Sequence, residues 1–177
     1  PLFVWMGEIL FRTKLSENLF EGLSPWMQKL PGGLIHVNVV GCAIFAAISG
    51  SSAATVATVG KMSIPELRKR NYPEKILLGS LAGSGTLGLL IPPSIILIIY
   101  GVTVQESIAK LFIAGIFPGI MIAIIFMTYV VIWSLMNKNK MPVLTEEIPF
   151  IEKIKKSGKL IPVILLIVSV IGSIYSG

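Results

Sequence analysis

Two groups of glycine, serine and proline residues interrupt apolar stretches of this sequence. The first is Ser49-Gly50-Ser51-Ser52, and the second runs from Gly83 to Ser94, including Pro92-Pro93. Two adjacent prolines remove two helical donors and so free carbonyl oxygens one turn earlier, around Gly88 and Leu89. Carbonyl and hydroxyl oxygens without a nearby carboxylate suit a hard monovalent cation such as sodium, while the exposed N-termini of half-helices suit an anion.

A plainer explanation exists for the same residues. Glycines let helices pack closely and prolines kink them, and a single such residue most often has one of these roles. Irregular backbone within a bilayer is tolerated only where it is buried in protein or lines a cavity, because each unpaired peptide group in lipid costs several kcal/mol. Two dense groups separated by about 35 residues therefore favour a binding site over packing alone.

The composition indicates that lipid is the solvent of this chain. Of its 177 residues, 54% are hydrophobic and 14% are charged, and the mean hydropathy is +0.83, outside the usual range of soluble domains. Fifteen Lys and Arg against nine Glu give a net charge of +6. On an apolar chain this excess marks cytoplasmic loops rather than nucleic-acid binding. We expect an all-α polytopic membrane protein.

The residue inventory excludes several kinds of chemistry. The chain has no Asp, so no Asp-based triad or magnesium site can be built from it. One His and one Cys cannot form a self-contained zinc site, which needs three or four such ligands. We therefore expect no enzyme of these kinds. The sequence also begins inside an apolar run without a secretory signal, which predicts an interior piece of a longer protein.

Apolar segments of spanning length indicate how the chain crosses the bilayer. About 20 apolar residues are needed, because about 30 Å of hydrocarbon is crossed at about 1.5 Å per residue. The segments that meet or approach this length are 76–100, 111–136 and 160–176, with 1–11 as the end of a fourth. Because 76–100 contains the second group of small residues, we expect a broken helix there.

The apolar stretch 34–60 has basic residues on both flanks. A single crossing would place one basic flank outside, against the positive-inside tendency. A re-entrant hairpin that turns at Gly50-Ser51-Ser52 removes this conflict, and its arms of about 15 and 8 residues are each too short to span. Residues 61–75 then form a cytoplasmic loop, and fourteen of the fifteen basic residues lie inside, with only Lys110 outside.

Two further helices are expected at the cytoplasmic surface. Apolar residues recur at helical spacing across 15–30 among polar ones, which is typical of an amphipathic helix in the membrane interface. Pro25 is expected to kink or divide this helix. Ser63 and Glu66 have capping-box spacing and, with Pro65, predict a short helix that ends near Arg70.

A long motif, Gly85-Thr86-Leu87-Gly88-Leu89-Leu90-Ile91-Pro92-Pro93-Ser94, occupies the second group. Further motifs are Pro1 to Arg12, Leu30-Pro31-Gly32-Gly33 with His36-Val37-Asn38, Phe45 to Ser52, Tyr100-Gly101, Leu111 to Gly115 and Pro118-Gly119. Over residues 1–136 the chain thus resembles the large membrane subunit of the tripartite ATP-independent periplasmic (TRAP) transporters.

The resemblance implies an elevator-type carrier, similar to the ion transporter superfamily, that is multi-pass in the bacterial inner membrane. A sodium gradient would drive uptake of a small organic anion such as a C4-dicarboxylate, a 2-oxo acid or a sialic acid. The implied partners are a small membrane subunit and a periplasmic substrate-binding protein, with no nucleic acid and no cofactor beyond the coupling ion.

The resemblance also implies a division of the chain, as the first half of the subunit. Residues 1–33 would be the end of a scaffold helix with an interfacial arm, and residues 34–137 would be half of the transport domain. The last part, 138–177, would be a basic connector followed by a scaffold transmembrane helix.

In such carriers the first hairpin and the following broken helix frame one sodium site and half of the substrate site. Carried over by motif, the sodium-binding residues are Gly50, Ser51, Ser52, Gly85, Thr86, Gly88 and Pro92, and the substrate-binding residues are Ser51, Ser52 and Ser94. No catalytic residue is implied. Coordination is expected from carbonyls and from hydroxyls such as those of Ser51, Ser52 and Thr86.

Three other functions fit parts of the pattern. A non-transporting scaffold subunit would have straight helices and would use its glycines for packing. A channel can use a re-entrant loop with free carbonyls as a filter. An intramembrane serine hydrolase would need Ser51 or Ser84 with His36, but neither serine has a Gly-x-Ser-x-Gly frame. His36 and Asn38 are instead expected near the start of the hairpin, satisfied by interfacial water.

Overall fold

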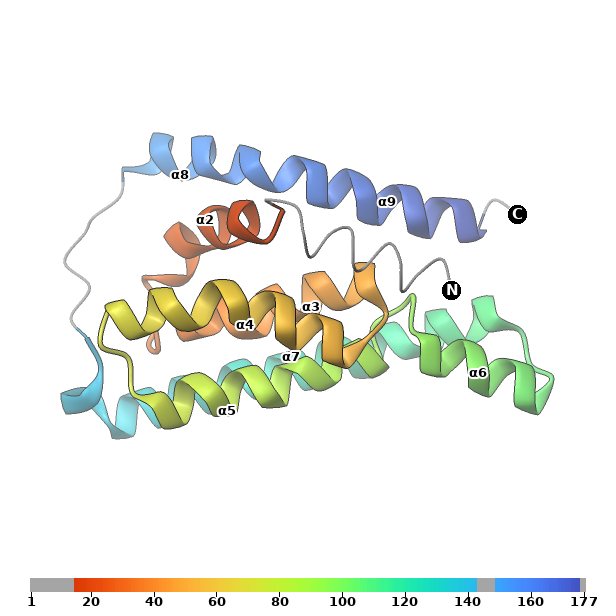
Figure 1. Ribbon diagram of the computed structural model, residues 1–177, viewed down its shortest axis with the longest axis horizontal. Helices are drawn as coiled ribbons and strands as arrows, with labels where there is room; N and C mark the ends of the chain where they lie inside the picture. Colours follow the sequence, from red (N-terminus) through yellow and green to blue (C-terminus); the bar gives the residue numbers. More distant parts are fainter. Residues whose placement is uncertain (1–14, 143–148, 176–177) are drawn as a thin grey trace.

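The computed structural model describes residues 15–142 and 149–175, and all regular structure in these ranges is helical (Figure 1). The elements are α2 (Leu15–Met27), α3 (Ile35–Ser49), α4 (Ser52–Lys69), α5 (Glu74–Gly85), the 3-10 helix η1 (Thr86–Leu89), α6 (Ile95–Val104), α7 (Ile108–Met136), the 3-10 helix η2 (Lys138–Lys140), α8 (Phe150–Ser157), the 3-10 helix η3 (Gly158–Leu160) and α9 (Ile161–Tyr175). The helix expected over 1–11 lies outside the described residues.

Helix α3 is the centre of the packing. It contacts α2, α4, α5, α7 and α9, and most of its side chains are buried, among them Val39 and Phe45. At Gly41 an added Cβ would make ordinary contacts with the side chains of Leu19 and Val59, at 3.5 and 3.6 Å. Helices α2 and α4 therefore lie directly against α3.

Helices α3 and α4 form a hairpin that turns where the sequence predicts. Gly50 adopts the left-handed conformation, with φ of +60°, and its N–H donates to the carbonyl of Ala46. Ser51 is extended, and its hydroxyl accepts a hydrogen bond from the N–H of Ala54, which caps α4. The start of α3 and the end of α4 consequently lie at the same end of the molecule (Figure 1).

The second arm of the hairpin is longer than the sequence predicts. Helix α4 continues to Lys69, so residues 61–69 are helix rather than loop, and the prediction of a separate helix beginning near Ser63 is wrong. The cause is a face that is buried at every fourth residue, each at most 1% exposed: Thr55, Val59, Ser63 and Leu67. This packing outweighs the one hydrogen bond that Pro65 removes.

The segment 76–100 is broken, as expected. Helix α5 ends at Gly85, η1 follows, and α6 begins only at Ile95, after a Pro92-Pro93 peptide bond in the cis form. We call residues 90–93 the loop of the interruption. It lies beside the α3–α4 turn, part way along the molecule (Figure 1). The straight helix expected of a packing-only subunit is therefore not found here.

Helix α7 has 29 residues and is, within the described ranges, the one helix that is by itself long and apolar enough to cross a membrane. Its exposed surface is apolar, as at Phe117 and Ile124. The other predicted spans are represented by shorter helices, α5 with α6 for 76–100 and α9 for 160–176. An all-helical fold with exposed apolar faces agrees with a membrane protein.

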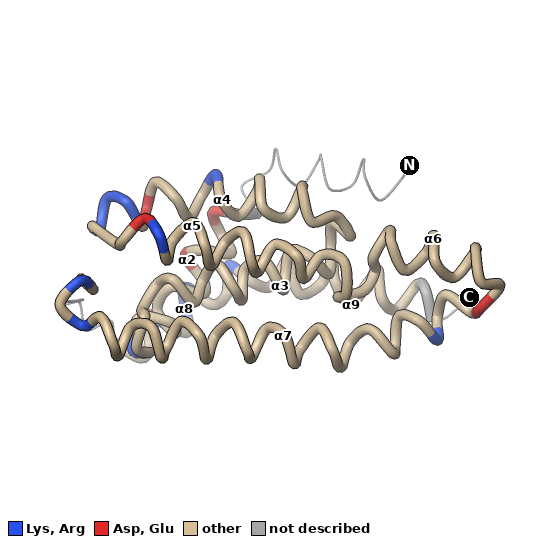
Figure 2. The backbone as a smooth tube through the Cα atoms, turned by 90° about the horizontal axis from the view of Figure 1, so that it is seen from below, with Lys and Arg blue, Asp and Glu red and all other residues tan. Residues whose placement is uncertain are grey.

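Basic residues gather at one end of the molecule. Figure 2 shows Lys and Arg at the end formed by the α4–α5 turn, the C-terminal end of α7, and α8. The opposite end, where α6 turns into α7, carries only Glu106 and Lys110 as charged residues among those described. The open end of the α3–α4 hairpin lies at the basic end.

A buried tyrosine joins two segments at this basic end. Tyr72, in the α4–α5 turn, is 4% exposed, and its hydroxyl accepts a hydrogen bond of 3.1 Å from the N–H of Leu34, just before α3. Burial raises the pKa of Tyr72. The neutral hydroxyl therefore fixes the α4–α5 turn against the start of the hairpin.

Helix α2 packs its apolar side into protein. Leu19, Phe20 and Leu23 belong to the buried core, and α2 contacts α3 and α4. The amphipathic pattern predicted a helix correctly; these three apolar side chains face protein, while Trp26 and Leu30 of the same stripe are exposed. Pro25 lies in the last turn and does not divide the helix, because only the hydrogen bond to the carbonyl of Glu21 is lost there.

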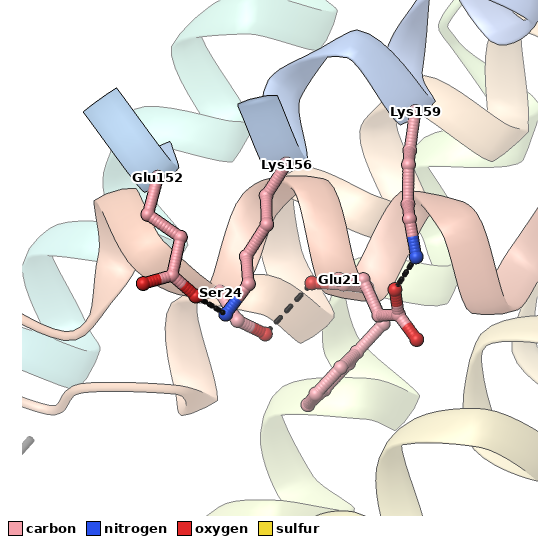
Figure 3. Close-up of polar contacts among 6 residues, drawn as sticks. Glu21, Ser24, Glu152, Lys156 and Lys159 are labelled. Carbon is pink, nitrogen blue, oxygen red and sulfur yellow. Dashed lines mark hydrogen bonds and ion pairs between the residues drawn. The ribbon is translucent and has the colours of Figure 1, made fainter. Parts of the chain in front are cut away.

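In the segment expected as a basic connector, residues 150–160 form α8 and η3, which dock on α2. The indole N–H of Trp26 donates to the hydroxyl of Ser157 at 2.8 Å, and its ring meets Phe150 edge-on, with the centroids 6.4 Å apart. Lys159 forms an ion pair with Glu21 (Figure 3). Parts of the chain separated by more than 120 residues are thereby joined at the basic end.

A cavity of about 630 Å³ lies between α2, α4 and α8. Ser24 lines it, and the ion pair between Glu152 and Lys156, at 3.0 Å, lies beside it (Figure 3). Its charged lining residues are of both signs, namely Glu17, Glu21, Glu66, Lys61, Arg70 and Lys156. Mixed charges of this kind do not favour an ion of either sign, and the cavity is separate from the site described next.

Candidate functional site

The α3–α4 turn and the interruption between α5 and α6 are hydrogen-bonded to each other. The N–H of Ile95, at the start of α6, donates to the carbonyl of Gly50 at 3.2 Å. The hydroxyl of Ser52, at the start of α4, donates to the carbonyl of Gly85 at 2.8 Å. The two groups of small residues found in the sequence, about 35 residues apart, therefore form one structural unit.

Glycines are required where these two segments touch. A Cβ on Gly50 would lie 2.5 Å from the carbonyl oxygen of Pro93. A Cβ on Gly88 would lie 2.9 Å from the backbone nitrogen of Ser52, and one on Gly85 would overlap the side chain of Val56. The glycines thus allow close packing, which is the role expected of glycines in membrane helices. The segments that they bring together are the two stretches of irregular backbone that could bind a ligand.

The hydroxyl groups nominated from the sequence already have partners. Ser51 caps α4, Ser52 bonds to Gly85, and Ser94 donates to the carbonyl of Leu89 at 2.8 Å. A hydroxyl that donates its proton retains lone pairs for a cation. Ser94 is buried, while Ser51 and Ser52 are partly exposed.

Thr86 is the nominated residue that the structure does not bring to the turn. Its hydroxyl donates to the carbonyl of Gly83 at 2.7 Å, within its own chain segment, and the residue is exposed. Pro92, in contrast, is buried in the loop of the interruption.

Backbone carbonyls of the loop form a feature that the sequence located only approximately. Free carbonyls were expected around Gly88 and Leu89. The carbonyl of Gly88 receives no hydrogen bond from the described residues, whereas that of Leu89 accepts one from the hydroxyl of Ser94. The carbonyl oxygens of residues 90–93 receive no hydrogen bond from the residues that the structure describes. The pair of prolines signals the break but not which carbonyls it leaves open, because that depends on how η1 ends.

The electrostatics around this unit come from dipoles alone. Residues 30–60 and 76–105 contain no Lys, Arg or Glu. Helices α4 and α6 both begin at the unit, so the positive ends of two helix dipoles are present together with open carbonyl oxygens. Such a site can receive a monovalent cation on the carbonyls and an anion at the helix N-termini.

His36 and Asn38 are buried rather than hydrated, which corrects the expectation from the sequence. Both are 0% exposed. The side-chain amide of Asn38 donates to the carbonyl of Leu77 at 3.2 Å and to the hydroxyl of Ser80 at 3.0 Å, which joins α3 to α5. The His36 ring bonds to the carbonyl of Pro31 at 2.8 Å. These residues hold the hairpin in place and lie outside the site.

The geometry gives no support to a serine hydrolase. The hydroxyl of Ser84 donates to the carbonyl of Ser80 at 2.6 Å, and Ser51 caps a helix. Within the described part of the chain, no hydrogen bond links His36 to either serine. A nucleophile–base pair is therefore not formed.

Comparisons with known proteins agree with the architecture. Residues 1–177 match the family model described as "Tripartite ATP-independent periplasmic transporter, DctM component". Over its whole length, the chain is 36% identical to a C4-dicarboxylate TRAP transporter large permease protein of Pseudomonas aeruginosa, and the match covers 41% of that protein. Over 77% of its length, the chain is 36% identical to an ectoine/5-hydroxyectoine TRAP transporter large permease protein of Ruegeria pomeroyi, and the match covers 32% of that protein.

A third relative is the 2,3-diketo-L-gulonate TRAP transporter large permease protein of Escherichia coli, 41% identical over 68% of this chain and 28% of that protein. The chain thus spans about two fifths, or less, of the length of these relatives. All three are described as permeases rather than enzymes. The chain belongs to the DctM component family of the tripartite ATP-independent periplasmic transporters, a family of membrane permease proteins.

Proposed function

We propose that this chain forms part of the membrane subunit of a secondary transporter, in which a sodium gradient drives uptake of a small organic anion. The observation that carries the proposal is the unit made by the α3–α4 turn and the α5–α6 interruption. There two helix N-termini and a loop with open carbonyls meet in a segment without charged side chains. In a membrane such irregular backbone must be buried in protein or line a cavity.

Sodium is the coupling ion that these donors fit best. Calcium and magnesium recruit carboxylates, and none is present in this part of the chain. Carbonyl and hydroxyl oxygens satisfy a monovalent ion without a compensating charge. Ligands are proposed from the turn (Gly50, Ser51 and Ser52) and from the interruption (Gly85, Gly88 and Pro92), with Thr86 the weakest member because its hydroxyl bonds back to Gly83.

The substrate is proposed to be anionic because α4 and α6 begin at the same unit. Ser51, Ser52 and Ser94 are the side chains proposed to contact it. The names of the relatives mention a C4-dicarboxylate, ectoine and 2,3-diketo-L-gulonate at similar identity. Since such different compounds go with similar sequences, we propose a class of substrate, small carboxylates, rather than one compound.

The subunit is proposed to have a defined orientation in the membrane and two protein partners. The basic end is placed in the cytoplasm, so the α3–α4 hairpin enters and leaves the membrane from that side. The tripartite description of the family supports a small membrane subunit and a periplasmic substrate-binding protein as partners. Transport would follow an elevator mechanism in the inner membrane, in which the unit moves against a scaffold that includes α9.

Uptake by the complete transporter tests this proposal. Here the complete transporter means the full membrane complex that contains this chain, reconstituted in liposomes with its binding protein. Labelled carboxylates should accumulate only with an inward sodium gradient, saturably, and only with the binding protein present. Non-saturable flux without the binding protein would support a channel, and equal uptake with potassium in place of sodium would reject sodium coupling.

A further inference from the structure

Two glycines on α7 face the loop of the interruption. Gly115 and Gly119 are one helical turn apart and are both buried, whereas Ile116 and Phe117 between them are exposed. Neither glycine was among the residues nominated for the site. They define a notch on α7, which we call the α7 seat.

The loop backbone occupies this seat. A Cβ on Gly115 would lie 2.6 Å from the carbonyl oxygen of Leu90, and one on Gly119 would lie 2.8 Å from Cγ1 of Ile91. Carbon–oxygen contacts are normally no shorter than about 3.3 Å, so a methyl group at position 115 would displace the Leu90 carbonyl by about 0.7 Å. At position 119 the obstacle is a side chain, which can turn aside more easily than backbone.

Few hydrogen bonds hold the loop, and one of them, from the hydroxyl of Ser94 to the carbonyl of Leu89, joins the residues on either side of it. Its last two residues are prolines, which have no N–H to donate, and the carbonyls of residues 90–93 receive no hydrogen bond from the described residues. At its start, the N–H of Ile91 bonds to the carbonyl of Leu87 at 2.9 Å. At its end, Pro93 lies against Gly50 of the turn. Between these points, the loop packs against α7 at Gly115 and Gly119.

We propose that Gly115 and Gly119 are positioning residues of the transport site, which act by holding the 90–93 loop at the correct distance from the α3–α4 turn. The inference rests on the proposed function, because the effect of the seat is measured as a change in sodium binding at the loop carbonyls. The seat itself touches neither ion nor substrate. Its role is to hold the loop carbonyls in a fixed position before the cation binds. Without the seat, binding of the cation would have to fix the position of these carbonyls, which would weaken binding.

The test compares Gly115→Ala, Gly119→Ala and the control Gly79→Ala in the complete transporter. Gly79 is exposed on α5, and an added Cβ there meets nothing within 4 Å. Half-maximal sodium concentration, maximal uptake at saturating sodium, and melting temperature are measured for each. We expect Gly115→Ala to raise the half-maximal sodium concentration by roughly threefold or more, with most of the maximal uptake and thermal stability retained.

Gly119→Ala should act in the same direction but less, and Gly79→Ala should match the wild type. A folded Gly115→Ala variant with wild-type sodium dependence would overturn the inference, as would losses of stability and uptake without a change in sodium concentration dependence. If the Gly115→Ala protein does not accumulate, the half-maximal sodium concentration of Gly119→Ala tests the inference instead, and a wild-type value in that variant would overturn it. A wild-type transporter indifferent to sodium would overturn the proposed function itself, which separates that failure from failure of the seat.

Discussion

Replacement of Gly50 by alanine should destabilise the protein through two separable effects. The left-handed conformation at φ of +60° costs an alanine about 1 kcal/mol or more. The new Cβ would also lie 2.5 Å from the carbonyl oxygen of Pro93, which must move by about 0.8 Å to reach an ordinary contact. That movement strains the hydrogen bond from Ile95 to Gly50, worth about 1 kcal/mol. Together these effects amount to about 2 to 3 kcal/mol.

The matched variant Gly50→Asn separates the two effects, because asparagine tolerates the left-handed region but keeps the Cβ. Melting of the complete transporter should show Gly50→Ala lowered by several degrees, Gly50→Asn lowered by a smaller amount, and Gly79→Ala near the wild type. Both variants should also need more sodium for half-maximal uptake. Full recovery of stability in Gly50→Asn would show that the contact with Pro93 is unimportant, and a wild-type melting temperature for Gly50→Ala would refute the whole argument.

Three further changes test other parts of the account. Ser52→Ala removes the hydrogen bond to the interruption and should cost about 1 kcal/mol of stability while raising the sodium concentration for half-maximal uptake; unchanged values would remove this contact from the site. Leu19→Lys combined with Leu23→Lys buries two charges in the core and should abolish accumulation of folded protein, measured by size-exclusion chromatography; a normal yield would contradict the packing of α2. Trp26→Phe keeps the aromatic contact but loses the hydrogen bond to Ser157, so the melting temperature should fall by a few degrees, and an unchanged value would show that α8 is not held there.

Much of the fold follows from local chemistry that is visible in the sequence. The turn at Gly50 and the break before Ile95 were predicted because left-handed glycine and adjacent prolines act on the backbone wherever they stand. The helical character of 15–27 and 111–136 follows from spacing and length, although the helix predicted over 15–30 ends at Met27. These features need no knowledge of which segments become neighbours.

The features that the sequence did not predict depend on tertiary packing. Helix α4 continues past residue 60 because its buried face has partners in α3 and α5, which a hydropathy pattern containing Ser63 does not reveal. Asn38 was expected in water because its partner, Ser80, is 42 residues away. The α7 seat was missed for the same reason, since glycines in a spanning helix give no sign of what they face.

The residues of the site were only partly foreseeable. Recognisable motifs nominated Gly50, Ser52, Gly85 and Gly88. In the structure Ser52 contacts Gly85 and Gly88, and Gly50 lies against Pro93. The motifs also nominated Thr86, whose hydroxyl instead bonds within its own segment. A threonine near a helix end readily donates a hydrogen bond to a preceding carbonyl. Motif matching does not show whether its hydroxyl forms that local bond or points toward a ligand.

Sodium binding to the unit formed by the turn and the interruption is the central claim, and thermal stabilisation measures it without transport. The complete transporter is melted in sodium chloride and in choline chloride at equal ionic strength, as wild type and as Gly88→Val. In the variant a branched side chain enters the contact with Ser52, where a Cβ would already lie 2.9 Å from the backbone nitrogen. A ligand at 100 times its Kd stabilises by about 2.7 kcal/mol, enough to raise the melting temperature by several degrees. The account predicts this sodium-specific rise in the wild type and its loss in a folded Gly88→Val variant, whereas an equal rise in both proteins, or none in the wild type, would contradict it.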